Sequence, residues 1–138
     1  MADVIYTSFK ADIMNGNIDL DTDTIKVMLV TSAYTPSASH AKRSSITDEV
    51  VGAGYTTLGK TITTPTVTNV GTNGVFDGDD IVWTSSTITA RGAVLFKSRG
   101  GASSADELIC YLDFGSDKVS TAGSFTISWN ASGILNLA

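Results

Sequence analysis

The sequence contains a single cysteine, Cys110, in 138 residues, so no disulfide can form within the chain. Stable disulfides belong to oxidising compartments, and their absence favours folding in a cytosol, although a bacterial surface is also compatible with it. The N-terminal residues lack the basic start and the long apolar stretch of a secretory signal peptide. No apolar run reaches the roughly 20 residues that cross a bilayer. We therefore expect a protein that is made in a cytosol and does not enter a membrane.

Charge and histidine are also scarce. Only 17% of the residues are charged, and the net charge is −5. Proteins that bind phosphate backbones need clustered Lys and Arg, and the nearest approach to a cluster is Lys42–Arg43. His40 is the only histidine, so a zinc site or a Ser-His-Asp triad would lack most of its usual partners. The sequence predicts no nucleic-acid binding, no cofactor and no enzymatic activity.

Short β-strands account for most of the pattern in the chain. In Ser124–Asn130 apolar and polar residues alternate strictly, which is typical of a half-buried strand. Glu107–Phe114 is apolar on both faces, and we expect it to pair with Ser124–Asn130 across a connection bounded by Gly115 and Gly123. About seven or eight such strands follow one another in a single domain, residues 1–138. This pattern predicts a mainly β fold, an antiparallel β-sandwich, with a small closed barrel as the alternative.

The exception is a short N-terminal helix, predicted over residues 3–14. Asp3 is positioned to cap its start, and Asn15–Gly16 supplies a stop signal. Apolar side chains four residues apart form one stripe: Ile5, Phe9 and Ile13. Because a helix of this length is not stable alone in water, the stripe must dock on the sheet or on a neighbouring subunit.

Residues 32–52 form an irregular loop, with a short helical turn expected from Ser45. Connections of this length inside a compact domain tend to be functional or mobile, so the loop is our first candidate for a partner contact. We expect deletion of residues 33–50 to abolish attachment and to leave the fold intact. The predicted partner interface combines this loop with both termini: Ile5, Phe9, Ile13, Tyr34, Pro36, His40, Ile134, Leu135 and Leu137.

Two acidic turns are the only candidates for a metal site. Asp19, Asp21 and Asp23 have the spacing that opens a calcium loop, but the glycine and the bidentate glutamate that should follow are missing. Asp77, Asp79 and Asp80 form the second turn. Because aspartate is common in turns for its local hydrogen bonds, we expect both to be solvated turns and predict no bound metal.

Five segments, in order, resemble a family of small structural proteins of tailed-phage virions: Asn15–Val30, Gly74–Trp83, Gly92–Lys97, Leu108–Asp113 and Phe125–Asn130. The resemblance covers nearly the whole chain. It implies a non-enzymatic virion component, made in the host bacterial cytoplasm and present as a homo-oligomer, for which a trimer is one closed form. A capsid decoration or cement protein, bound to the major capsid protein on the outer head shell, is the preferred member of this class. A tail, baseplate or fibre-associated protein is the close alternative.

A carbohydrate-binding β-sandwich module is the second hypothesis. Exposed aromatic side chains would line its sugar site, with calcium at the Asp turns. The aromatic candidates are Tyr34, Tyr55, Trp83, Tyr111 and Trp129. Trp83 and Trp129 occur in register with apolar residues, so we expect both to be buried.

Overall fold

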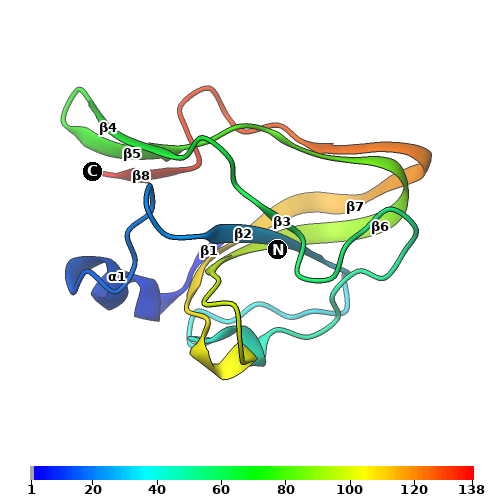
Figure 1. Cartoon of the computed structure of the whole chain (residues 1–138), viewed down its shortest axis with the longest axis horizontal. Coiled ribbons are helices and arrows are strands. Elements are labelled where there is room, and N and C mark those ends of the chain that lie inside the picture. The colour runs from blue at the N-terminus through cyan, green and yellow to red at the C-terminus, as the bar shows by residue number, and fades with distance from the viewer. Residues whose placement is uncertain (1) are drawn as a thin grey trace.

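A computed structural model describes residues 2–138. It is mainly β, with two antiparallel sheets (Figure 1). The larger sheet has the strand order β1-β7-β6-β2-β3, and the smaller has the order β4-β5-β8. The elements are β1 (Val4–Ile5), α1 (Thr7–Met14), β2 (Ile25–Val30), β3 (Lys60–Thr61), β4 (Thr66–Val70), β5 (Asn73–Asp77), β6 (Ile81–Lys97), β7 (Leu108–Ile127) and β8 (Leu135–Leu137). This arrangement confirms the predicted sandwich-like β fold of seven or eight strands with one short N-terminal helix.

The two longest strands, β6 and β7, form a ribbon that folds back over itself. Phe114 and Phe125 are eleven residues apart in β7, a distance of about 36 Å in a straight strand. Their ring centroids nevertheless lie 6.3 Å apart. Figure 1 shows the ribbon turning back at the right-hand end of the molecule. One half of the ribbon therefore lies at the centre of the large sheet, and the other half covers it.

Buried serine hydroxyls fix this bend. Ser86 is fully buried, and its hydroxyl lies 2.9 Å from the Ser120 hydroxyl, 3.0 Å from the Trp83 carbonyl oxygen and 2.9 Å from the Gly123 carbonyl oxygen. The pairing of β6 with β7 shifts register on both sides of Ser86. Buried polar groups must be hydrogen-bonded to be tolerated, so these contacts allow a polar bend inside an apolar core.

The bend corrects one prediction. Glu107–Phe114 and Ser124–Asn130 do not pair with each other across a connection, because both contribute to β7 and each pairs with a different half of β6. Tyr111 lies opposite Val94, whereas Phe125 lies opposite Trp83. The small residues that resembled a turn between two strands are irregularities within one continuous ladder.

The apolar core lies between the two layers that the ribbon creates. Val27, Leu29 and Leu95 contribute from the large sheet, and Trp83 and Phe125 contribute from the half of the ribbon that covers it. These side chains belong to a single buried cluster, which is the usual result of packing two sheet faces.

Cys110 belongs to the same cluster and is buried, as its strand pattern predicts. Burial raises the pKa of its thiol to about 12. The thiol therefore stays neutral at physiological pH and packs as a small apolar group.

Helix α1 is shorter than predicted and starts later. Val4 and Ile5 belong to β1, where they lie opposite Tyr111 and Cys110 of β7. Asp3 does not cap the helix, because one of its carboxylate oxygens accepts a hydrogen bond of 2.7 Å from the Asp113 backbone N–H. Adjacent β-branched residues suit a strand edge better than a helix start.

No helix within residues 2–138 is long and apolar enough to span a membrane.

The loop over residues 32–52 is irregular, but the body of the protein anchors it. Its one helical turn is a 3₁₀ turn at Arg43–Ser45, slightly earlier than predicted. Val50 is buried, and Glu49 accepts hydrogen bonds of 2.6 Å from the Tyr55 hydroxyl and from the Leu58 backbone N–H. Deleting residues 33–50 would remove these contacts, so we expect this deletion to destabilise the fold as well as to affect attachment.

Strands β4 and β5 form a hairpin. Val70 lies opposite Asn73, so the two turn residues are Gly71 and Thr72. The Asn73–Gly74 dipeptide is a common turn signal in hairpins, but here it lies within β5. Because Asn73 is already paired, β5 starts directly after the turn. This hairpin and β8 form the small sheet at one end of the molecule (Figure 1).

Candidate functional site: an apolar groove between the N-terminal helix and the small sheet

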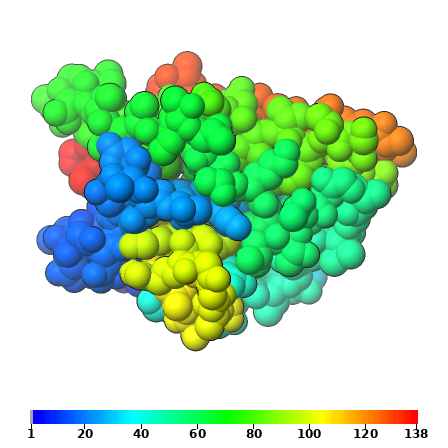
Figure 2. All heavy atoms as spheres, in the orientation of Figure 1, coloured from blue at the N-terminus to red at the C-terminus, as the bar shows by residue number. Residues whose placement is uncertain are grey.

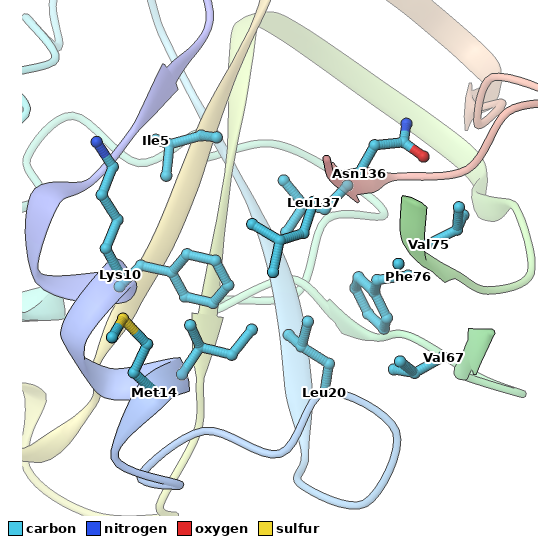
Figure 3. A pocket seen from close by; sticks show the side chains of 13 residues that line it. Ile5, Lys10, Met14, Leu20, Val67, Val75, Phe76, Asn136 and Leu137 are labelled. Carbon is cyan, nitrogen blue, oxygen red and sulfur yellow. The ribbon is translucent and has the colours of Figure 1, made fainter. Parts of the chain in front are cut away.

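An apolar groove opens between α1 and the small sheet, with a volume of about 410 Å³. We call it the α1–β8 groove. Figure 3 shows its side chains converging from the helix on one side and from β5, β8 and β4 on the other. The lining residues are Ile5, Phe9, Lys10, Ile13, Met14, Leu20, Val67, Gly74, Val75, Phe76, Leu135, Asn136 and Leu137.

Two simple periodicities build the walls. On the helix, Phe9 and Ile13 are four residues apart and share one face. On the sheet, Val67 of β4 lies opposite Phe76 of β5, and Phe76 lies opposite Leu135 of β8. Residues directly opposite in adjacent strands share a face of the sheet. Each wall therefore presents a continuous apolar surface to the other.

The groove concentrates the exposed apolar surface of the protein. Eight large apolar side chains are exposed within residues 2–138, and four of them line the groove. Their exposed fractions are 45% for Ile5, 85% for Met14, 48% for Val67 and 70% for Leu137. Scattered apolar side chains on a surface are ordinary, but a contiguous apolar patch indicates an interaction site.

Polar groups are few at this site. Lys10 on α1 and Asn136 on β8 are the polar side chains of the lining. Within the part of the chain that the structure describes, the exposed Lys10 ammonium forms no ion pair or hydrogen bond. The groove is therefore suited to an apolar segment that carries a carboxylate opposite Lys10.

Sequence reasoning located much of this groove. Ile5, Phe9, Ile13, Leu135 and Leu137, all predicted interface residues, line it together although they come from opposite ends of the chain. In Figure 2 the N-terminal segment (blue) and the C-terminal strand (red) lie at the same end of the molecule. The predicted Ile134 is half-buried against the core just before β8.

Other groove residues were missed. Met14, Leu20, Val67 and Phe76 also line the groove. Val67 carried a signal, since it is an apolar residue between two threonines in a strand. Its partners could be identified only once the pairing of β4, β5 and β8 was known.

The predicted interface residues of the 32–52 loop lie elsewhere. Tyr34 is only 3% exposed, and its hydroxyl lies 2.9 Å from the Tyr6 hydroxyl and 2.9 Å from His40 Nδ1. Burial raises the pKa of Tyr34. The prediction that Tyr34 contacts a partner is wrong, because its hydrogen bonds hold the loop against the N-terminal segment. Pro36 and His40 are half-buried, and their role in a partner contact stays a prediction.

The first acidic turn is held together by its own contacts. An Asp23 carboxylate oxygen accepts a hydrogen bond of 2.8 Å from the Asp19 backbone N–H and lies 2.8 Å from the Lys97 ammonium. Burial opposes ionisation of Asp23, but these two contacts outweigh it and hold the pKa of this carboxyl below its ordinary value. Asp21 accepts a hydrogen bond of 3.3 Å from the Thr22 hydroxyl. The turn is therefore built around an ion pair to β6.

The second acidic turn is also held by hydrogen bonds from other parts of the chain. Asp77 accepts a hydrogen bond of 2.8 Å from the Gly78 backbone N–H, and Asp80 accepts one of 3.0 Å from the Trp129 backbone N–H. Asp79 accepts hydrogen bonds from two threonine hydroxyls, at 3.2 and 2.9 Å. Within residues 2–138, no group of three His, Cys, Asp or Glu side chains could hold a metal ion.

The aromatic residues considered for a sugar site are mostly inaccessible. Tyr34, Trp83 and Tyr111 are buried. Tyr55 and Trp129 are half-buried, so the expectation of full burial is confirmed for Trp83 and wrong for Trp129. The Trp129 indole N–H donates a hydrogen bond of 2.8 Å to the Asp79 carbonyl oxygen. This N–H is therefore already bonded within the chain.

An ion pair between the buried Glu107 carboxylate and the exposed Arg99 guanidinium predicts how stability depends on pH. Glu107 accepts two hydrogen bonds from the Arg99 guanidinium, at 2.8 and 2.7 Å, and its side chain is 5% exposed. Bonding to Arg99 holds the pKa of Glu107 below its ordinary value of 4.5. The stabilisation is fully present above that ordinary value and is lost as pH falls through the lowered one. We expect the melting temperature to fall below about pH 4.5, and to fall less steeply in Glu107→Gln.

Thermal melts of the two proteins between pH 7 and pH 2 measure this difference. Other carboxylates titrate in both proteins, so the comparison of slopes isolates Glu107. Parallel curves for the two proteins over the acid range would contradict the prediction.

In comparisons with known proteins, no family model, curated protein or solved structure matches this chain.

Proposed function

We propose that the protein is a structural component of a tailed-phage virion, a capsid decoration protein that docks on the outer head shell through the α1–β8 groove. The observation that carries this proposal is the concentration of exposed apolar side chains in one groove. The resemblance of five segments to small virion proteins supports the same conclusion. The function lies in a binding surface, and the protein acts in an assembly of several copies.

Docking at this groove would be driven by apolar burial. Covering one large aliphatic side chain contributes roughly 1.5–3 kcal/mol, and Met14 and Leu137 are both mostly exposed. An acidic group on the major capsid protein would pair with Lys10 at the rim. A ligand that binds only the assembled shell stabilises the shell by mass action, which is how a decoration protein would strengthen a head.

The groove has more support as the docking surface than the 32–52 loop. Tyr34 and Val50 of that loop are buried and unavailable to a partner. The carbohydrate-binding alternative has less support for a similar reason, because three of its five candidate aromatic side chains are buried.

The copy number of the protein in purified virions tests the proposal. Quantitative mass spectrometry against the major capsid protein should give a ratio near one, or a simple fraction repeated over the shell. A few copies per particle would instead assign the protein to the tail, baseplate or a fibre. Complete absence from the particle would overturn the virion proposal.

A further inference from the structure

The outer edge of β4 is a sheet edge without the usual protection. All five residues of β4, Thr66–Val70, are exposed, and the strand is last in the order of the small sheet. None of these residues carries a charge. Within the described part of the chain, β4 pairs only with β5. A long, uncharged, exposed edge is a template for pairing with another strand.

The edges formed by β1, β3, β7 and β8 are blunted. Strands β1 and β3 have two residues each, and β8 has three. An irregularity interrupts the β7 edge. Four residues of β7 lie between Asp113 and Lys118, whereas only one residue of β6 lies between their partners. Lys118 lies at the end of this irregularity. Short edges, bulges and edge lysines are the devices by which β proteins avoid pairing with one another. β4 has none of them, apart from Pro65 just before the strand.

The hairpin fixes which backbone groups of β4 point outward. Val70 and Asn73 close a two-residue loop, and such a loop is flanked by a hydrogen-bonded pair. Hydrogen-bonded and non-hydrogen-bonded pairs alternate along an antiparallel ladder. The N–H and C=O groups of Val67 and Asn69 therefore point away from β5, toward the open edge.

We propose that two copies of the chain pair through β4, antiparallel, about a two-fold axis at Thr68. Val67 of each copy then lies opposite Asn69 of the other, and the pair exchanges both main-chain hydrogen bonds. The threonines at the axis face each other, an arrangement that favours cross-strand pairing. The two small sheets join into one continuous sheet of six strands.

The absence of charge along β4 allows a second copy to occupy this edge. Each chain carries a net charge of −5, so two copies repel through most of their surfaces. β4 is uncharged along its length and lets two chains approach without placing like charges opposite each other. An isologous two-fold contact also closes on itself and does not continue into a fibre.

Pairing about an axis normal to the sheet keeps equivalent faces on the same side. Val67 contributes to the apolar wall of the groove, so both α1–β8 grooves of the dimer open on one side of the six-stranded sheet. The dimer does not depend on the virion proposal, and it is a different closed form from the trimer named above as one possibility.

Light scattering coupled to size exclusion, over a range of micromolar concentrations, tests the dimer on the full chain. The wild-type protein should reach twice the 14.4 kDa mass of the single chain. Asn69→Pro removes an outward N–H from each copy and should weaken dimerisation about 30-fold or more. Asn69→Ala keeps that N–H and should dimerise like the wild type.

A second pair of variants covers the case in which the proline disturbs the hairpin. Thr68→Lys places two lysines opposite each other at the axis and should give a monomer. Thr89→Lys makes the same change at an exposed position of β6, opposite Val119 of β7 and outside the small sheet, and should leave the dimer intact. A wild-type protein that stays monomeric, or an oligomer unaffected by both Asn69→Pro and Thr68→Lys, would overturn the proposal.

Discussion

Replacing Gly59 by alanine should prevent the chain from reaching its native fold. Gly59 has a φ of +74°, and a Cβ added there would collide with the Val27 carbonyl oxygen and lie 2.8 Å from Met28 Cα. Neither partner can move away, because β2 pairs with β3 on one side and with β6 on the other. A backbone clash of this kind should cost most of the roughly 5–15 kcal/mol that stabilises a domain.

Gly16→Ala is the matched control. Gly16 has nearly the same φ, +75°, but a Cβ added there meets nothing within 4 Å. This variant should lose only about 1–2 kcal/mol, from the left-handed backbone conformation. Soluble yield, circular dichroism and urea unfolding of both variants measure the difference. Equal stability of the two variants would show that the contact with β2 is not limiting.

Leu137→Asp should exclude the protein from virions while leaving its fold unchanged. The Leu137 side chain is 70% exposed at the rim of the α1–β8 groove, so the free protein loses little by the change. In a docked complex the variant forfeits apolar burial and must bury a carboxylate. We expect its incorporation to fall about 100-fold in competition with the wild-type protein.

Val119→Asp provides the comparison for this experiment. Val119 is a β7 side chain that is 65% exposed and does not line the groove. Both variants are supplied with the wild-type protein during infection, and mass spectrometry of purified particles gives each incorporation ratio. The groove is not the docking surface if Leu137→Asp is incorporated as well as Val119→Asp.

The periodicity of the sequence predicted the strands better than their connections. Glu107–Phe114 and Ser124–Asn130 have the pattern of two separate strands, yet both contribute to β7. In the same way, Ile81–Trp83 and Gly92–Phe96 are two apolar runs separated by small and polar residues, and both belong to β6. The turn residues between them lie in one hydrogen-bonded ribbon, where Ser85 and Ala122 adopt positive φ values of 49° and 46°. Local propensity indicates that the chain bends at such residues, but it does not indicate whether the ladder continues through the bend.

The part of the candidate site that could be predicted comes from a single element whose apolar residues repeat with the period of that element. The four-residue spacing of Phe9 and Ile13 indicates an apolar helix face without knowledge of the fold. Tyr34 had no such pattern, because burial of a loop side chain depends on what the tertiary structure brings to it. Here that is the hydroxyl of Tyr6, 28 residues earlier.

The folded-over ribbon also has a consequence for the order of folding. Phe96 and Leu108 pair next to the loop that connects β6 to β7, and they are only twelve residues apart in sequence. From this pair the ladder extends to its other end, where Ile81 pairs with Ile127. Each new pair closes next to one already formed, so the entropic cost of loop closure falls mainly on the first contact. Both layers of the ribbon can therefore form by successive pairing of β6 with β7 from a single local nucleus. The final contacts between the layers nevertheless join residues that are distant in sequence.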